Sequence, residues 1–251
     1  MRAVVAFASL VFAAPALAGS VSLTTADGVA LHAETWGTGS KGVVLVHGKE
    51  QSAEDWSRFA DGLASRGFHV IAVDLRGHGT SGQVSLSPAV YPQMTNDVAA
   101  ATGWIREHGA TEVHLIGANL GANLVVKMAA DDPEVTDIIM LSPGMNLDGV
   151  ISPTAIEAYG NRPALAVASS GDAYAARTLD VLDRKAQGRF YTEILAGDAS
   201  GVRMLTYDAH LESKLIAWLN GTYDIEGQRA SRTVGTEESG EVETSGVRFG
   251  D

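Results

Sequence analysis

The stretch VHLIGANLGA, residues 113–122, decides the fold predicted for this chain. Its first residues are mostly apolar, as in a buried strand, and the apolar run continues into a helix predicted over Gly121–Asp131. Gly117 and Gly121 frame Asn119, because a sharp turn between a strand and a helix crowds the backbone around it. A buried strand that turns directly into a helix is typical of a parallel sheet covered by helices.

The same alternation extends on both sides of this stretch. Before it, Val21–Thr25 and Val29–Glu34 alternate around Asp27-Gly28, which predicts an antiparallel hairpin. The predicted fold class is therefore α/β, a three-layer sandwich with a mostly parallel central sheet and an antiparallel hairpin at its N-terminal edge. The predicted strands are Gly42–His47, His69–Asp74, Glu112–Gly117, Asp137–Ser142, Ala164–Ala168 and Arg189–Ile194, and the predicted helices are Ala53–Ser65, Tyr91–Glu107, Gly121–Asp131, Ala173–Gln187 and roughly Met204–Leu219.

Composition and the chain ends predict three segments. Residues 1–18 combine Arg2, an apolar run over Ala3–Ala14 and a small-residue site at Ala16–Ala18, the pattern of a cleaved secretory signal peptide. Residues 19–220 form one domain, and residues 221–251 form a disordered acidic tail with few apolar side chains. We therefore expect a periplasmic or secreted protein that is free of the membrane after cleavage.

Charge and residue counts exclude several partner classes. The net charge of −12 argues against nucleic acid and anionic membranes, because both repel an acidic surface. The chain has no cysteine, and no pair of its seven histidines has the spacing of metal ligands. Neither a phosphate-binding loop nor a dinucleotide-binding fingerprint is present, so we expect no metal and no cofactor.

Three motifs in order resemble the α/β-hydrolase superfamily. They are Val44–Gly48, which ends in His-Gly; Asp74–Ser81, which has the D-x-R-G-H-G-x-S pattern; and Gly117–Gly121, which keeps the glycine frame of the G-x-S-x-G nucleophile elbow. The resemblance covers most of residues 40–220 and is closest to small members without a lid, similar to dienelactone hydrolases and serine-peptidase-like esterases. In place of the nucleophilic serine this chain has Asn119.

The resemblance also implies the remaining site residues. The backbone N–H groups of Lys49 and Leu120 would form the oxyanion hole. The triad acid follows the next-to-last parallel strand, where this chain has Asp172. Asp172 is equally suited to cap the helix that follows it, so both roles are open. Ser142, Ser169 and Ser170 lie near strand ends but not on an elbow, and we interpret them as turn or cap residues.

The position of the triad histidine has two candidates. His210 is the only histidine after Asp172, but placing the site there leaves only nine residues for the loop and the last helix. Placing it at Ser200 leaves Gly201–Leu219 and gives a glycine-rich loop with serine where histidine is usual. We favour Ser200, with His210 as a partly exposed helical residue and as the alternative base.

These substitutions lead to three hypotheses. The favoured one is a pseudo-hydrolase that binds a small ligand with a carbonyl or carboxylate group, because an asparagine amide is not nucleophilic. The alternative is an active ester or acyl hydrolase, or a lyase, with a non-standard mechanism that uses His210 and Asp172. A third is an interaction protein whose acidic tail binds a partner. Serine-type hydrolysis is not expected with Asn119 at the elbow.

Overall fold

The computed structural model describes residues 18–223. The predicted signal segment, except Ala18, and the predicted tail beyond Tyr223 lie outside the described residues, so both stay predictions. The described residues divide into two compact units, residues 18–212 and residues 213–223.

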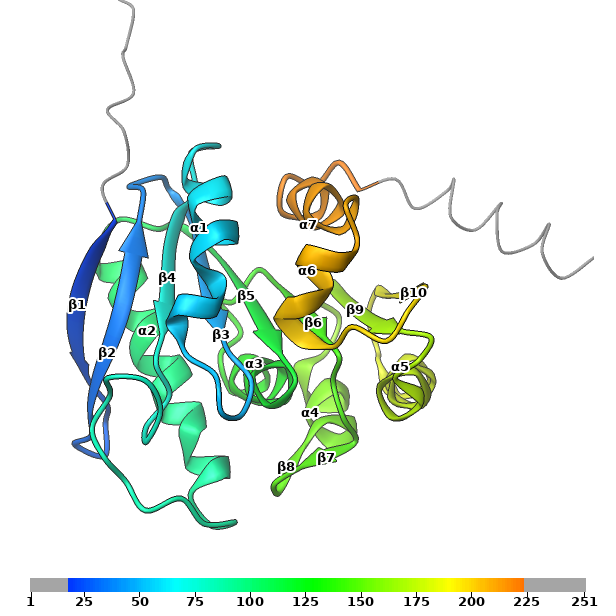
Figure 1. Ribbon diagram of the computed structural model, residues 1–251, viewed down its shortest axis with the longest axis horizontal. Helices are drawn as coiled ribbons and strands as arrows, with labels where there is room; N and C mark the ends of the chain where they lie inside the picture. The colour runs from blue at the N-terminus through cyan, green and yellow to red at the C-terminus, as the bar shows by residue number, and fades with distance from the viewer. Residues whose placement is uncertain (1–17, 224–251) are drawn as a thin grey trace, which may run out of the picture. The chain divides into compact units, whose positions relative to one another are not determined.

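The first unit is built on an eight-stranded sheet, which confirms the predicted fold class. The sheet is parallel from β4 to β10, and β1 and β2 form an antiparallel hairpin at one edge (Figure 1). β2 also pairs antiparallel with β4, which joins the hairpin to the parallel part. The strand order is β1 (Gly19–Thr24), β2 (Ala30–Trp36), β4 (His69–Val73), β3 (Lys41–Val46), β5 (Glu112–Ala118), β6 (Asp137–Leu141), β9 (Ala164–Ser169) and β10 (Phe190–Leu195).

Helices cover both faces of this sheet, so its central strands are buried. α2 (Thr95–Glu107), α3 (Leu120–Asp131), α4 (Ser152–Tyr159) and α5 (Ala173–Lys185) contact one another in this order. α1 (Ser57–Ala64) lies on the opposite side of β4 from α2 (Figure 1). The continuous apolar runs of β3, β4 and β6 therefore reflect strands that have no face toward water.

Four differences from the sequence prediction concern short or broken elements. Residues 146–159 contain a small hairpin of β7 (Asn146–Leu147) and β8 (Val150–Ile151), followed by α4. α4 has a proline in its first turn, which is a common helix-start signal. The helix expected over Met204–Leu219 is two helices, α6 (Met204–Tyr207) and α7 (Leu211–Leu219). Short 3₁₀ turns precede α1, α2 and α6, at Ala53–Trp56, Tyr91–Met94 and Gly201–Arg203.

A buried ion pair network anchors the loop after β4. The guanidinium of Arg76 is almost fully buried and donates to both carboxylate oxygens of Asp27 at 2.6 and 2.9 Å. It also donates to Asp97 Oδ1 from two nitrogens at 2.7 and 2.8 Å. Burial alone would lower the pKa of Arg76, but the two carboxylates outweigh it and raise that pKa. The arginine of the D-x-R-G-H-G-x-S motif is therefore a structural residue that ties the loop to the hairpin turn and to α2.

The second unit is described only up to Tyr223. α7 crosses from the first unit into it, and the chain continues in a turn in which Thr222 N donates to Ala217 O at 2.8 Å. The rings of Trp218 and Tyr223 lie edge to face at 5.6 Å within this unit.

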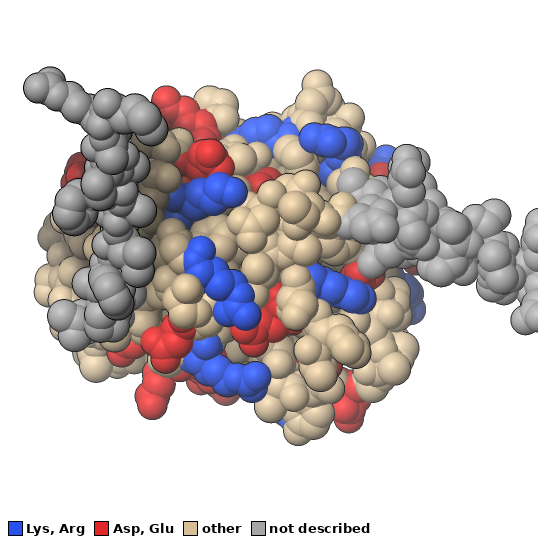
Figure 2. Space-filling model, turned by 90° about the horizontal axis from the view of Figure 1, so that it is seen from above, with Lys and Arg blue, Asp and Glu red and all other residues tan. Residues whose placement is uncertain are grey.

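Surface properties add two observations. On the face shown in Figure 2, basic and acidic side chains of the described residues are interspersed. Within residues 18–223 no helix combines the length and the apolar character that crossing a bilayer requires.

Candidate functional site

Asn119 occupies a strained turn between β5 and α3. Its backbone angles are φ 49° and ψ −113°, a positive-φ conformation outside the left-handed helical region and strained for a residue with a side chain. A Cβ on Gly117 would overlap the carbonyl oxygen of Gly121, and a Cβ on Gly121 would overlap the carbonyl oxygen of Val46 in β3. Both glycines are therefore needed for the turn to pack against the sheet, which presents Asn119 at the end of the central strand.

The structure brings together three of the residues singled out from the sequence. Asn119 Nδ2 donates to Ser200 Oγ at 2.8 Å, and Ser200 Oγ donates to Asp172 Oδ2 at 3.1 Å. Asp172 follows β9 and Ser200 follows β10, so both residues lie in loops at the carboxyl ends of neighbouring parallel strands. An amide, a hydroxyl and a carboxylate are thus joined in series by two hydrogen bonds.

Asp172 caps α5 and also contacts Ser200. Its Oδ1 accepts a hydrogen bond from the backbone N–H of Ala175 at 3.0 Å, which caps α5. Its Oδ2 faces Ser200. One carboxylate can do both because it has two oxygens with separate acceptor directions.

Two buried serines hold the residues on either side of Ser200, a role that the sequence analysis did not assign. Ser142 at the end of β6 accepts a hydrogen bond from Gly201 N at 3.0 Å. Ser169 at the end of β9 donates to the carbonyl of Ala199. Ser142 has a positive φ of 52°, so its backbone is also strained. The sequence signal for both serines is their position at the carboxyl ends of parallel strands, because ligand sites of parallel sheets form there.

The loop after β3, which carries Gly48 and Lys49 and is the predicted oxyanion loop, lies next to Asn119. A Cβ added to Gly48 would lie 3.1 Å from Asn119 Oδ1, so the loop passes close to the side chain. Within residues 18–223 the backbone N–H of Lys49 meets no acceptor, and that of Leu120 is the first in α3 and has no partner in its helix. Two backbone donors therefore lie beside the amide of Asn119.

The side chain of Lys49 reaches away from these donors. Its Nζ lies 3.2 Å from both oxygens of Asp148, in the turn between β7 and β8, and 4.9 Å from the ring centre of Tyr91. The hydrogen bond that Lys49 donates to the Asp148 carboxylate raises the pKa of Lys49. The ammonium group of Lys49 therefore contacts Asp148 and Tyr91 and not the side chain of Asn119.

His47 supports the oxyanion loop from inside. Its Nε2 accepts from the backbone N–H of Leu75 at 3.0 Å, so its Nδ1 carries the proton and donates to Gly48 O at 2.6 Å. Burial lowers the pKa of His47 to about 4. With both ring nitrogens in use and the ring neutral, His47 orients the backbone of Gly48.

His210 lies elsewhere in the first unit. It is an exposed residue of the turn between α6 and α7, not a helical residue as expected. Its backbone N–H donates to Asp208 Oδ1 at 2.8 Å. No contact among the described residues joins it to Asn119, Asp172 or Ser200. Its role as the alternative base is not tested by this placement and stays a prediction.

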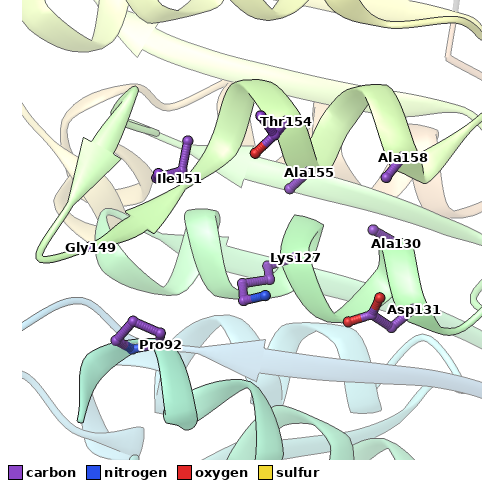
Figure 3. A pocket seen from close by; sticks show the side chains of 9 residues that line it. All are labelled: Pro92, Lys127, Ala130, Asp131, Gly149, Ile151, Thr154, Ala155 and Ala158. Atoms are coloured by element: carbon purple, nitrogen blue, oxygen red, sulfur yellow. The ribbon is translucent and has the colours of Figure 1, made fainter. Parts of the chain in front are cut away.

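Two further features do not join this site. In the part of the chain that the structure describes, no group of three or more His, Asp or Glu side chains is placed to hold a metal ion. A surface cavity of about 390 Å³ lies between α3 and α4, and Figure 3 shows Lys127 and Asp131 of α3 lining it with residues of α4. Lys127 is eight residues along α3 from Asn119, roughly 12 Å, so the cavity is separate from the amide. Its other lining residues are Pro92, Ala130, Gly149, Ile151, Thr154, Ala155 and Ala158.

Comparison with known protein sequences finds a hydrolase family model, and relatives that include hydrolases and haloperoxidases. The family model described as serine aminopeptidase, S33, matches residues 39–189, more than half of the chain. A non-heme chloroperoxidase of Streptomyces lividans is 37% identical over 110 residues, which are 43% of this chain and 38% of that protein. A 2-hydroxy-6-oxononadienedioate/2-hydroxy-6-oxononatrienedioate hydrolase of Pseudomonas sp. is 28% identical over 127 residues, 47% of this chain and 42% of that protein. The chain thus spans less than half the length of both relatives.

This chain also superposes on solved structures, and the match covers nearly all of each of the two described next. An esterase of Pyrococcus furiosus superposes with a TM-score of 0.71 at 18% identity, over 83% of this chain and 92% of that one. The α/β-hydrolase GrgF of a Penicillium species superposes with a TM-score of 0.70 at 13% identity, over 82% of this chain and 99% of that one. At such identities the likeness establishes the fold alone.

Proposed function

The chain belongs to the serine aminopeptidase S33 family of α/β-hydrolases, and from this premise we propose that it is a pseudo-hydrolase that binds a small molecule with a carbonyl or carboxylate group. The observation that carries the proposal is the Asn119–Ser200–Asp172 chain of hydrogen bonds at the elbow. It keeps the connectivity of a triad but lacks both of the groups that perform acyl transfer.

Neither substituted residue can perform the step of the residue it replaces. The lone pair of the Asn119 amide nitrogen is delocalised into its carbonyl, so this nitrogen does not attack an ester. The hydroxyl of Ser200 does not take up a proton near neutral pH, so it cannot act as the general base that histidine provides. Two independent losses leave no route to a covalent acyl intermediate at this position.

The features that bind a carbonyl group are kept. The backbone N–H groups of Lys49 and Leu120 are fixed by the loop after β3 and by the start of α3, and both lack an acceptor in the described chain. Such paired donors bind a carbonyl or carboxylate oxygen without any catalytic residue. The substrate in the name of the Pseudomonas relative carries an oxo group and two carboxylates, which is consistent with this ligand class.

The place of action that we propose is the periplasm or the medium. The support is the basic residue at position 2, the apolar run over Ala3–Ala14 and the small-residue site at Ala16–Ala18. N-terminal sequencing of the protein recovered from the expressing cell tests this, because an exported chain begins at Gly19.

The alternative function, an active hydrolase or lyase in which His210 acts as the base and Asp172 assists it, has less support. Both oxygens of Asp172 already accept hydrogen bonds, from Ser200 and from Ala175. An activity that disappears in the His210→Ala variant would favour this alternative over the pseudo-hydrolase.

The proposal is tested by ester hydrolysis. The assay compares the native chain, Asn119→Ser, Ser200→His and the double variant on p-nitrophenyl butyrate, with thermal melting as a check on folding. We expect no turnover by the native chain above that of heat-denatured protein, and a gain of at least about a hundredfold in the double variant over either single one, because nucleophile and base act together. Turnover by the native chain would contradict the proposal.

A further inference from the structure

The carboxylate of Asp172 fixes the direction of the hydrogen bonds that end at Asn119. A carboxylate only accepts hydrogen bonds. Its Oδ1 accepts from the backbone N–H of Ala175, and its Oδ2 lies 3.1 Å from Ser200 Oγ. The hydroxyl proton of Ser200 must therefore point at Asp172.

This direction is passed on to Asn119. A serine hydroxyl has one proton, and that of Ser200 is used on Asp172, so its oxygen can only accept from any other neighbour. Asn119 lies 2.8 Å from that oxygen and must place its NH₂ group there. The two ends of an asparagine amide are alike in shape, but here the hydrogen-bond network determines which end is which.

The carbonyl end of Asn119 is consequently turned away from Ser200. Its Oδ1 lies beside Gly201 and Gly48, since a Cβ on Gly201 would overlap it and a Cβ on Gly48 would come within 3.1 Å. Among residues 18–223 no group donates a hydrogen bond to this oxygen. The oxygen is not fully buried, so solvent or a ligand can reach it.

The site therefore combines one acceptor with two donors. The acceptor is Asn119 Oδ1, and the donors are the backbone N–H groups of Lys49 and Leu120 on the loop and helix next to it. A carboxamide matches this set, because its oxygen accepts from the backbone and its NH₂ donates to Oδ1. A carboxylate does not, because its second oxygen would face the lone pairs of Oδ1.

We propose that the Asp172–Ser200–Asn119 chain makes this site selective for a neutral ligand with a carboxamide, or another N–H group beside a carbonyl, over the matching carboxylate. The inference rests on the proposed function and narrows its ligand class. A bound carboxylate would press its second oxygen against Asn119 Oδ1, and two acceptors cannot form a hydrogen bond. This mismatch costs about a factor of ten in affinity, which is the selectivity expected between a carboxamide and the matching carboxylate.

The inference predicts that one substitution reverses the selectivity. In Asp172→Asn the new side-chain carbonyl still accepts from Ala175 N, so α5 stays capped. The new NH₂ group donates to Ser200, whose proton is then free to point at Asn119. Asn119 turns its carbonyl to Ser200 and its NH₂ to the ligand, and the site becomes a set of donors that suits a carboxylate.

Hexanamide and hexanoate are the probes, and their dissociation constants are measured by ligand-observed NMR titration. The native protein is expected to bind hexanamide about tenfold more tightly, and Asp172→Asn is expected to bind hexanoate more tightly. Asp198→Asn is the matched control, because Asp198 lies against Gly171 in the neighbouring loop. It removes one negative charge without touching the hydrogen-bond chain, so it should keep the preference for hexanamide.

The outcomes separate this inference from the proposed function. Binding of both probes by the native protein without discrimination, or the same preference in the native protein and in Asp172→Asn, overturns the inference and leaves a binding site in place. A preference for hexanoate in Asp198→Asn as well would overturn it too, since charge would then explain the reversal. Absence of binding by every variant contradicts the proposed function itself. Asn119→Gly, which the positive φ at this position favours, is expected to lose the discrimination.

Discussion

The buried His47 should make the fold less stable as the pH falls from 6.5 toward 4. The ring is fully buried, and burial lowers its pKa from 6.5 to about 4. A second proton would sit on Nε2, where Leu75 N now donates, so the charged form loses a hydrogen bond as well as its hydration. Below pH 6.5 the unfolded chain therefore binds this proton, whereas the folded chain binds it only near pH 4.

The sign and size follow from these two values. Because the folded pKa is depressed, the contribution is complete above pH 6.5 and is lost as the pH falls toward 4. Between pH 7.5 and 4.5 the free energy of unfolding should decrease by about 2.5 kcal/mol on account of His47 alone. Urea denaturation at the two pH values measures this difference.

His47→Gln is the matched variant. Its amide can accept from Leu75 N and donate to Gly48 O, but it does not titrate. His69, whose pKa burial also lowers, acts in the same direction in both proteins, so its contribution cancels from the comparison. The variant should lose about 2.5 kcal/mol less than the native chain over this pH range. An equal loss in both proteins would refute the assignment of the buried neutral tautomer.

Five substitutions at four positions test the packing of the fold by chemical denaturation. Arg76→Ala leaves Asp97 buried without its partner and should lower the free energy of unfolding by about 3–5 kcal/mol; a change below about 1 kcal/mol would show that the pair is not buried in solution. Asp172→Ala should cost about 1 kcal/mol through the lost cap of α5, while Asp172→Asn should cost almost nothing. Gly121→Ala should cost roughly 1–3 kcal/mol by overlap, whereas Gly103→Ala, with open space around it in α2, should stabilise by about 0.5–1 kcal/mol; equal effects would contradict the tight elbow.

The sheet could be predicted because its signals are local. The Asp27-Gly28 hairpin pairs as expected, and each predicted parallel strand lies within a residue or two of the observed one. Apolar runs mark strands that are buried on both faces, whatever lies above them. The elbow was also predictable, since its glycines are required by the backbone and not by a distant partner.

The missed elements are those whose signals are short or tertiary. β7 and β8 have two residues each, too few for any alternation to be visible, and α4 has eight. The break at residues 208–210 places Asp208 as a cap for the next helix, with its Oδ1 accepting from the backbone N–H of His210 and Leu211. A helical pattern that continues in sequence does not reveal such a stop.

The sequence named the residues of the candidate site but not the contacts around them. Asn119, Asp172 and Ser200 were placed by motif and by strand order. The contacts of Ser142 with Gly201 and of Ser169 with Ala199 join residues 59 and 30 positions apart. They depend on how strand ends meet at one edge of the sheet, so the sequence alone suggested only turn or cap roles for these serines.

The central claim is that the elbow of this chain has no covalent nucleophile. Intact-protein mass spectrometry after incubation with an alkyl fluorophosphonate tests it directly, with the Asn119→Ser/Ser200→His variant as the positive control. We expect the native protein to keep its mass while the variant gains one phosphonyl group at position 119. A stoichiometric adduct on the native protein, at Ser200 or at any other serine near Asp172, would contradict the claim.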